Sequence, residues 1–299
     1  MQQEGNIKAL ENTNILDTPK ILDHTESICP VCLKVIPAEI VQDKNKVVYM
    51  QKTCPEHGLT LAYLWPDAEH YLWMNAFRMP EKPPQFPQPS SEGCPQDCGL
   101  CTSHLRHPTL VEIEVTEQCN LRCPVCFMEA GSKDRKVVLD PDLETIRQMY
   151  VDILKKSGPQ TSIQLTGGEP TTNKNLTEII RMGKELGFSA IEINTNGVIL
   201  GRNPSYAHEL AEAGASGVFL QFDGLTGEVY EKTRGKDLLN IKLRAIEYCR
   251  EAGIQVVLAM TVIWGINHDQ MGDVLDFALQ NKDVPEDAAL LPGGIDLSP

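Results

Sequence analysis

The sequence predicts an α/β protein: a partial, TIM-like barrel of five or six βα units, preceded by a small cysteine-rich, metal-binding ribbon module. From about residue 109 onward, segments with the pattern of strands alternate with segments that have the pattern of helices. All but one of the 10 cysteines fall into three groups of three, and a proline-rich stretch over 80–93 separates the first group from the other two. We therefore expect a ribbon module over 1–79, a linker with a second cysteine motif over 80–107, and the α/β core over 108–299.

Each predicted strand of the core is a short apolar run that a helical pattern follows. The strands are expected at 109–115, 162–166, 190–194, 217–222 and 255–263. The helices are expected at 141–156, 173–186, 204–213, 237–252 and 268–281, between start and stop signals. A sixth strand is expected after the last helix, where the sequence ends. We therefore expect a core that is truncated in its sixth strand and a substrate pocket that is open.

The formal net charge of -14 excludes functions that need a basic surface. Nucleic acid and anionic lipid headgroups would be repelled, and no basic patch is visible. The sequence begins without the basic start and apolar run of a signal peptide. Its longest near-apolar stretch, 254–266, is shorter than the roughly 20 residues that span a bilayer. We expect a cytoplasmic protein without a transmembrane segment.

Cysteines in a cytoplasmic protein indicate metal binding rather than disulfides. Cys249 is the exception, because it stands alone in an amphipathic helical stretch. We expect it to be a small hydrophobic residue of the core.

Cys119, Cys123 and Cys126 form a Cys-x3-Cys-x2-Cys motif shortly after the first predicted strand of the core. Three thiolates on one short loop can hold three irons of a [4Fe–4S] cluster and leave the fourth iron without a protein ligand. A zinc site or an ordinary ferredoxin site would need a fourth ligand nearby, but the next candidates are His208 and Cys249. Catalytic loops collect at this end of a β/α array. These three cysteines are therefore predicted to hold the cluster of a catalytic centre.

A second motif, Gly167-Gly168-Glu169-Pro170, follows the next predicted strand. A cysteine loop of this spacing, with a Gly-Gly-Glu-Pro turn one βα unit later, resembles the radical S-adenosylmethionine superfamily over residues 109 to about 299. The resemblance implies a radical SAM barrel in which the methionine amino and carboxylate groups of S-adenosylmethionine chelate the open iron. An electron from a reductant such as ferredoxin or flavodoxin then yields a 5′-deoxyadenosyl radical, which removes hydrogen from an unactivated carbon.

The same resemblance implies contacts with the cosubstrate at the ends of successive strands. The implied residues are Gly167, Gly168 and Glu169 for its amino group, Asn194 and Asn196 for its ribose or carboxylate, Gln221 and Asp223 facing cosubstrate or substrate, and Met260 and Thr261 as further candidates. The glycines would allow a close approach of the backbone. For the residues on the last two strands, packing at the strand end or a polar cap is the alternative.

Cys94, Cys98 and Cys101 repeat the Cys-x3-Cys-x2-Cys spacing but follow the proline-rich linker instead of a strand. We expect an auxiliary [4Fe–4S] cluster there, with a fourth ligand from elsewhere or an open iron. His104 and His107 are either ligands or solvated loop histidines, and structural zinc is the alternative to a cluster.

Two metal knuckles flank a predicted hairpin that turns at 43–46. Cys29 and Cys32 form the first knuckle, and Cys54 and His57 form the second. Such a ribbon binds one tetrahedral ion, here with three cysteines and one histidine, and both iron and zinc suit these ligands. Iron would allow electron relay, whereas zinc would hold together a small fold with little core.

The order of all these motifs, from about residue 28 to 290, resembles the tetraether synthase group of radical SAM enzymes, which is also described as pterin methyltransferase-like. The resemblance implies transferase chemistry that joins isoprenoid lipid chains by C–C bonds, in lipid biosynthesis. Radical methylation of a pterin precursor, a small-molecule substrate, is the alternative. An iron–sulfur electron carrier or scaffold with a degenerate core is the non-enzymatic alternative, but such a protein would not need both motifs of the core.

Overall fold

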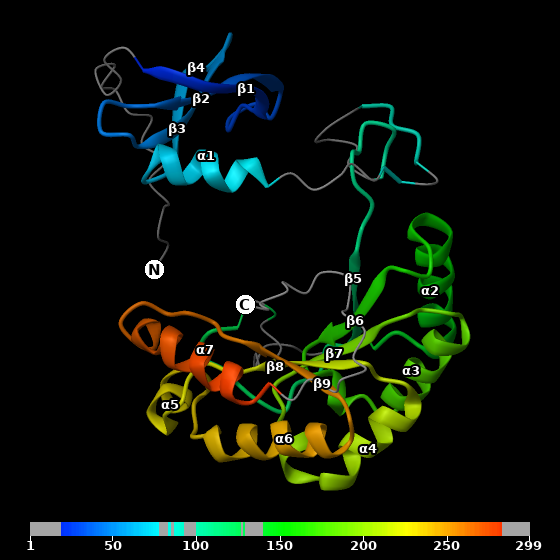
Figure 1. Cartoon of the computed structure of the whole chain (residues 1–299). Coiled ribbons are helices and arrows are strands. Elements are labelled where there is room, and N and C mark those ends of the chain that lie inside the picture. The colour runs from blue at the N-terminus through cyan, green and yellow to red at the C-terminus, as the bar shows by residue number, and fades with distance from the viewer. Residues whose placement is uncertain are drawn as a thin grey trace. The chain divides into compact units, whose positions relative to one another are not determined.

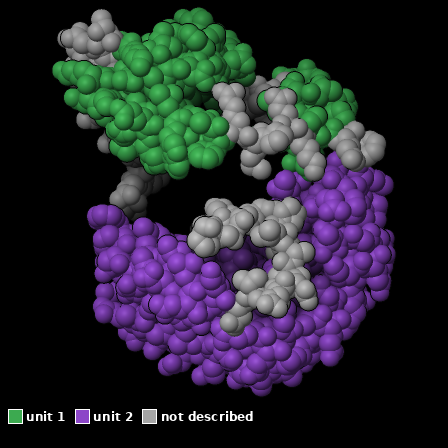
Figure 2. Space-filling view, in the orientation of Figure 1, with its two compact units in different colours: residues 1–107 green, residues 108–299 purple. Residues whose placement is uncertain are grey.

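The computed structural model describes residues 19–77, 83–84, 87–92, 100–126, 128 and 140–282. The chain divides into two compact units, residues 1–107 and 108–299, which Figure 2 shows in different colours. The predicted sixth strand of the core lies outside the described residues. No helix in the described part of the chain has the length and the apolar composition of a membrane span.

The first unit contains a four-stranded antiparallel sheet in which each strand pairs with the next along the chain. Its elements are β1 (Lys20–Ile28), β2 (Val35–Gln42), β3 (Val48–Cys54), β4 (Gly58–Trp65) and the following helix α1 (Ala68–Ala76) (Figure 1). The turn between β2 and β3 forms because the Asp43 carboxylate accepts hydrogen bonds from the N–H groups of Asn45 and Val47, at 2.9 and 2.8 Å. The predicted hairpin is therefore confirmed, and β1 and β4 extend it on both sides.

The apolar core of this sheet is small. One buried cluster contains Ile40, Val48 and Ala68, and a second contains Cys29, Ile36 and Cys54. A unit of this size buries too little apolar surface for much stability on its own.

The second unit is built on a five-stranded parallel sheet whose strands follow one another in chain order. The strands are β5 (Leu110–Thr116), β6 (Ser162–Gly167), β7 (Ile191–Thr195), β8 (Gly217–Gln221) and β9 (Gln255–Ala259). Parallel neighbours in this order need a crossover between each pair, and helices supply it. The antiparallel ribbon and the parallel sheet with its helices together confirm the predicted fold class.

The helices of this unit are α2 (Leu143–Ser157), α3 (Leu176–Glu185), α4 (Pro204–Ala213), α5 (Gly227–Arg234), α6 (Leu239–Glu251) and α7 (Met271–Gln280), with short 3₁₀ turns η1 (Pro170–Thr172), η2 (Leu200–Arg202) and η3 (His268–Gln270). In Figure 1, α2, α3, α4 and α6 lie one after another along one side of the sheet. Helix α4 matches its prediction, since Pro204 begins it and Gly214, with φ of 103°, ends it.

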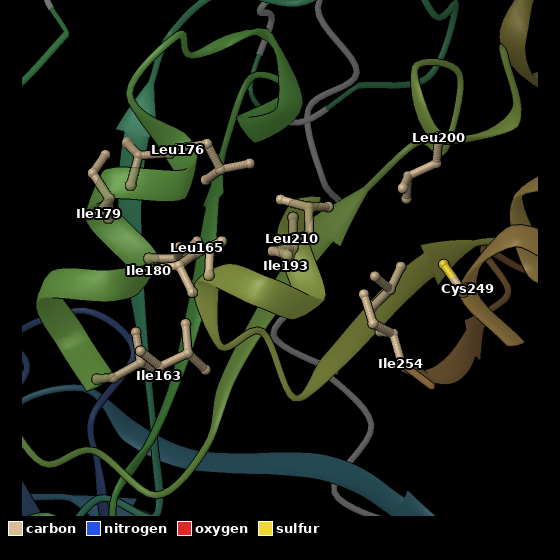
Figure 3. Packing of buried hydrophobic residues seen from close by; sticks show 14 of the residues in the cluster. Ile163, Leu165, Leu176, Ile179, Ile180, Ile193, Leu200, Leu210, Cys249 and Ile254 are labelled. Atoms are coloured by element: carbon tan, nitrogen blue, oxygen red, sulfur yellow. The ribbon is translucent and has the colours of Figure 1, made fainter. Parts of the chain in front are cut away.

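The main core fills the space between this sheet and its helices (Figure 3). Ile163, Leu165 and Ile193 come from the strands, while Ile180 comes from α3. Cys249 of α6 is 1% exposed in the same cluster, and burial raises its pKa to about 12. Its predicted role as a core hydrophobe is confirmed.

Two predictions about the elements were wrong. The fifth strand was expected to run to residue 263, but β9 ends at Ala259. Beyond it, backbone N–H groups donate hydrogen bonds to side chains instead of to a neighbouring strand. The N–H of Ile263 donates to the side chain of Asn267 at 2.7 Å, and the N–H of Thr261 donates to Asp223 at 3.2 Å. The prediction also passed over α5, although an i,i+4 pair of Glu228 and Lys232 marks it as a helix.

Candidate metal centres and cosubstrate site

The ribbon brings four ligand atoms together. Cys29 and Cys32 lie in the turn after β1, Cys54 ends β3, and His57 lies in the turn before β4. The ligand atoms of all four residues lie within 4.8 Å of one another. The Sγ atoms of Cys54 and Cys29 lie 3.4 and 3.6 Å from Nδ1 of His57, and those of Cys32 and Cys54 lie 3.9 Å apart.

These separations match the edges of a tetrahedron around one ion. With bonds of about 2.3 Å to sulfur and about 2.0 Å to nitrogen, two sulfurs lie about 3.8 Å apart and a sulfur and a nitrogen about 3.5 Å apart. The backbone N–H of Cys32 also lowers the pKa of Cys29 to about 6 by hydrogen bonding, which favours the thiolate that binds metal. The four side chains therefore fit a single metal ion.

The cysteine loop of the second unit follows β5 and rests on buried apolar residues. Leu121, between the first two cysteines, is 3% exposed and clusters with Tyr230 of α5. Cys119 and Cys123 pack against this cluster, whereas Cys126 is exposed. Burial raises the pKa of the Cys119 thiol. Buried residues thus support the first two cysteines of the loop, whereas its third cysteine is exposed.

Three cysteines on one short loop suit an iron–sulfur cluster, because a cluster lets each thiolate bind a different iron. The assignment of Cys119, Cys123 and Cys126 as ligands of a [4Fe–4S] cluster stays a prediction.

The Gly-Gly-Glu-Pro turn after β6 lies directly against the start of the cysteine loop. The N–H of Gly168 donates to the carbonyl of Thr116 at 2.8 Å, and that of Glu169 to the carbonyl of Gln118 at 2.7 Å. A Cβ on Gly167 would stand 2.1 Å from the Thr116 oxygen, and one on Gly168 2.2 Å from the Gln118 oxygen. The glycines therefore let two parts of the protein meet. Their predicted approach to the cosubstrate stays a prediction.

The carboxylate of Glu169 is 1% exposed and joins two turns of the site. It accepts hydrogen bonds from the N–H and hydroxyl of Thr171 at 3.1 and 2.6 Å, from the hydroxyl of Thr195 at 2.6 Å, and from the N–H of Asn196 at 2.7 Å. Four donors match the acceptor capacity of a carboxylate. Glu169 thus ties the turn after β6 to the end of β7, and its contact with an amino group stays a prediction.

The two asparagines predicted at β7 differ in their surroundings. The side-chain nitrogen of Asn196 donates to the side-chain oxygen of Asn120 in the cysteine loop at 2.7 Å. Its own oxygen accepts from the N–H of Val198 at 3.0 Å. Asn194 lies half-buried within β7. Asn196 therefore links the strand end to the cysteine loop, while the ribose or carboxylate contact of both asparagines stays a prediction.

Asp223, two residues after β8, is 0% exposed and binds other protein groups. Its two oxygens accept from Nε and Nη2 of Arg234 at 2.6 and 3.0 Å, and the hydroxyl of Thr233 donates to it at 2.9 Å. Burial alone would raise the pKa of Asp223, but the Arg234 guanidinium holds that pKa below its usual value. Asp223 therefore positions Arg234, and its own contact with the cosubstrate or substrate stays a prediction.

Sequence reasoning missed Arg234 because it missed α5. The side chain lies beside the cysteine loop: burial would lower its pKa, but Asp223 and the neighbouring Cys123 thiol keep that pKa above its usual value. A Cβ built on the next residue, Gly235, would lie 4.0 Å from the carbonyl of Arg122. The hydroxyl of Thr261 accepts from Nη2 of Arg234 at 3.4 Å.

Gln221 ends β8, and its side-chain oxygen accepts a hydrogen bond from Nζ of Lys242 at 2.6 Å. Hydrogen bonding from the same side chain also contributes to the low pKa of Asp223. The contact of Gln221 with the cosubstrate or substrate stays a prediction.

Only the last cysteine of the linker motif can be placed. Cys94 and Cys98 lie outside the described residues. Cys101 Sγ lies 3.5 Å from Nδ1 of His104, and the N–H of His104 donates to the carbonyl of Cys101 at 3.1 Å. Of the two histidines considered from the sequence, the structure thus places His104 beside a cysteine of the motif.

Three features together define an enzyme class: the parallel sheet, the cysteine loop after its first strand, and the glycine turn after its second strand. The family model described as the radical SAM superfamily matches residues 113–278, and the chain belongs to this superfamily. A second model, the HMPTM N-terminal zinc ribbon domain, matches residues 21–66. The superfamily implies a [4Fe–4S] cluster, S-adenosylmethionine and a reductant.

Two curated relatives show what the chain is similar to. The 7,8-dihydro-6-hydroxymethylpterin dimethyltransferase of Methanocaldococcus jannaschii is 40% identical over 261 residues, which cover 87% of this chain and 51% of the relative. A probable GTP 3′,8-cyclase of Methanothermobacter marburgensis is 30% identical over 190 residues, which cover 63% of this chain and 60% of the relative. The chain thus spans little more than half the length of the curated relatives it matches.

Solved structures resemble the chain more distantly. Streptococcus suis SuiB bound to its precursor peptide SuiA is 18% identical, with a TM-score of 0.49, and the match covers 59% of this chain and 38% of that one. Methylornithine synthase is 18% identical with a TM-score of 0.47, covering 63% and 57%. Likeness at this level carries no inference about the site.

Proposed function

We propose that this chain binds a [4Fe–4S] cluster through Cys119, Cys123 and Cys126 and cleaves S-adenosylmethionine reductively. When bound, the cluster and its cosubstrate supply a 5′-deoxyadenosyl radical for hydrogen abstraction. The position of the three cysteines on one loop after β5, hydrogen-bonded at its start to the Gly-Gly-Glu-Pro turn after β6, supports this proposal. The protein's own part is to hold the cysteine loop on its apolar support and to orient the cosubstrate.

The substrate that we propose is a reduced pterin with a hydroxymethyl group, which the enzyme methylates. The observation that carries this proposal is the 40% identity, over 87% of the chain, to a pterin dimethyltransferase. The ribbon supports it, because the ribbon also matches the HMPTM family model. This is the alternative that the sequence motifs left open. The joining of isoprenoid lipid chains stays a prediction that no observation on the structure favours.

The other metal sites have supporting roles in this proposal. The ribbon ligands Cys29, Cys32, Cys54 and His57 would hold zinc, because the matching family model is that of a zinc ribbon. Zinc would stabilise a unit whose apolar core is small. The auxiliary [4Fe–4S] cluster at Cys94, Cys98 and Cys101 stays a prediction.

A single incubation tests the proposed function. The full chain is reconstituted anaerobically with iron and sulfide, reduced, and incubated with S-adenosylmethionine and 7,8-dihydro-6-hydroxymethylpterin. Parallel reactions contain methyl-labelled S-adenosylmethionine or a one-carbon-loaded tetrahydropterin as carbon source. We expect 5′-deoxyadenosine together with a methylated pterin, detected by mass spectrometry.

Two outcomes would count against it in different ways. Protein with a full complement of iron that forms no 5′-deoxyadenosine would exclude radical SAM activity in this chain. Formation of 5′-deoxyadenosine without methylated pterin, in both carbon-source reactions, would exclude the pterin. The same assay with archaeal diether lipid would then test the lipid prediction.

A further inference from the structure

The loop between β9 and η3, residues 260–267, presents a tryptophan to solvent. Trp264 is 85% exposed, although its indole is one of the largest apolar side chains. The loop follows the carboxyl end of β9, and β/α arrays bind their ligands at this end of their strands. The exposed ring therefore belongs to the edge of the sheet where a substrate is expected.

A buried asparagine holds this loop in one conformation. Asn267 is 0% exposed, and its Oδ1 accepts from the N–H of Ile263 at 2.7 Å. Its Nδ2 donates to the carbonyl oxygens of Thr261 and Asp223 at 2.9 and 2.8 Å. Within the loop, the N–H of Ile266 donates to the carbonyl of Ile263 at 3.1 Å. The exposed indole thus stands on a fixed backbone, which lowers the entropy cost of binding a ligand on it.

The indole itself is supported on one face. Its ring stacks on the imidazole of His268, with the ring centroids 4.1 Å apart and the planes 31° apart. The imidazole is held in turn, because its Nδ1 accepts from the N–H of Gly265 at 3.0 Å. An exposed fraction of 85% leaves the other face of the indole open. A flat ring can stack on that open face.

The same loop is tied to the residues beside the cysteine loop. At its start, the N–H of Thr261 donates to Asp223 at 3.2 Å, and the hydroxyl of Thr261 accepts from Arg234 at 3.4 Å. Arg234 is the arginine whose pKa the neighbouring Cys123 thiol helps to raise. Trp264 follows Thr261 by three residues, which is about 10 Å at most along an extended backbone. The indole is therefore anchored close to the proposed radical centre, where the substrate must lie for hydrogen abstraction.

We infer that Trp264 is a substrate-binding residue whose open face stacks on the fused ring of the pterin. The inference rests on the proposed function, because it takes the pterin as the substrate. A pterin is a flat, fused nitrogen heterocycle, and stacking on an aromatic side chain is a general way in which proteins bind such rings. The adenine of S-adenosylmethionine is a second flat heterocycle, so the test separates the two.

The experiment measures pterin binding without turnover. Equilibrium dialysis gives the dissociation constant of 7,8-dihydro-6-hydroxymethylpterin for the reconstituted full chain, with S-adenosylmethionine present and no reductant. Trp264→Leu keeps an apolar side chain but removes the stacking, and we expect it to raise the dissociation constant about tenfold. Trp264→Phe keeps a smaller ring and should raise it about threefold. Trp73→Leu, at a tryptophan of α1 that is 59% exposed, is the control and should bind like wild type.

Iron content and the dissociation constant of S-adenosylmethionine are measured for the same variants, and we expect both to stay unchanged. If Trp264→Leu loses affinity for S-adenosylmethionine, the indole serves the cosubstrate and the inference is overturned. Wild-type pterin binding by Trp264→Leu, or an equal loss in Trp73→Leu, would also overturn it while the proposed function stands. Iron-loaded wild type that binds S-adenosylmethionine but no pterin would overturn both this inference and the proposed substrate.

Discussion

The ribbon and the cysteine loop of the second unit each offer three cysteines, but they arrange them differently. The ribbon holds Cys29, Cys32 and Cys54 with His57 inside a sphere that suits one ion. The loop carries its three cysteines in one short segment, and the first two pack against buried residues such as Leu121. The apolar core of the ribbon is small, so we expect it to depend on the proposed zinc for stability, whereas the second unit has a large apolar core. Replacing a ligand should therefore have opposite consequences in the two regions.

Replacing a loop cysteine should have the largest effect on activity and a small effect on folding. We expect Cys123→Ala to abolish formation of 5′-deoxyadenosine and to lower the iron content, because a thiolate of the cluster is lost. The metal of the ribbon should stay bound. Iron, sulfide and zinc analysis, together with the cleavage assay, measures both.

Cys249→Ala is the matched control, because this cysteine lies in the core and not in a metal group. It should keep its iron and its cleavage activity, at a loss of roughly 1 kcal/mol of stability from the small cavity. Full cleavage by Cys123→Ala, or equal loss in both variants, would contradict the assignment of the loop.

Replacing a ribbon cysteine should instead unfold the ribbon and spare the loop. We expect Cys54→Ala to lose zinc because one of the four ligands is gone. The ribbon should then unfold, since structural zinc contributes on the order of 10 kcal/mol to small domains. Hydrogen exchange should then rise across β1 to β4 and stay unchanged across β5 to β9. A variant that keeps its zinc, or that loses protection in the parallel sheet, would break the comparison between the two regions.

Much of this comparison could be predicted from the sequence, because the ligands lie close together along the chain. Hairpin signals at Asp43, the Cys-x3-Cys-x2-Cys spacing and Pro204 with Gly214 around α4 are all local patterns. They identified the knuckles, the loop and most of the helices. Local patterns also suffice for the order of a parallel sheet whose strands pair in chain order.

The residues that sequence reasoning missed act through contacts that no local pattern shows. Arg234 meets Asp223 through a helix that follows the strand, and Lys242 meets Asn196 across 46 residues. A lysine in an amphipathic pattern is expected at the surface, so nothing local marks Lys242 as buried. The sequence identified Asp223 as a candidate site residue. It did not show that the Asp223 carboxylate binds the guanidinium of Arg234.

The buried pair of Asp223 and Arg234 tests how much the loop depends on its surroundings. We expect Asp223→Asn to lower the free energy of unfolding by about 3–5 kcal/mol, because it leaves the guanidinium buried without its counterion. The pKa of Asp223 is lowered in the folded state, so its stabilisation is present above the unfolded pKa of about 4 and is lost as the pH falls through the folded pKa. Urea denaturation at a series of pH values measures this.

Glu228→Gln supplies the control for that pair. Glu228 forms an exposed ion pair with Lys232 on the same helix, so its replacement should cost below about 1 kcal/mol. The role of Asp223 would be contradicted if both substitutions lowered the free energy of unfolding equally. It would also be contradicted if Asp223→Asn and wild type still differed in stability at low pH.

The smallest expected effect concerns the linker motif and would sharpen the comparison. Cys101 and His104 have the same Cys-x2-His spacing as Cys54 and His57, and their ligand atoms lie 3.5 Å apart against 3.4 Å in the ribbon. A sulfur and a nitrogen this close suit one ion, because ligands on different irons of a cluster stand farther apart.

We expect His104→Ala to lower the metal content of the chain partially, with cleavage of S-adenosylmethionine retained. His107→Ala should leave the metal content unchanged. Unchanged metal in His104→Ala would make His104 a hydrogen-bonding neighbour of Cys101, and the linker motif would then resemble the three-cysteine loop and not the ribbon with its histidine.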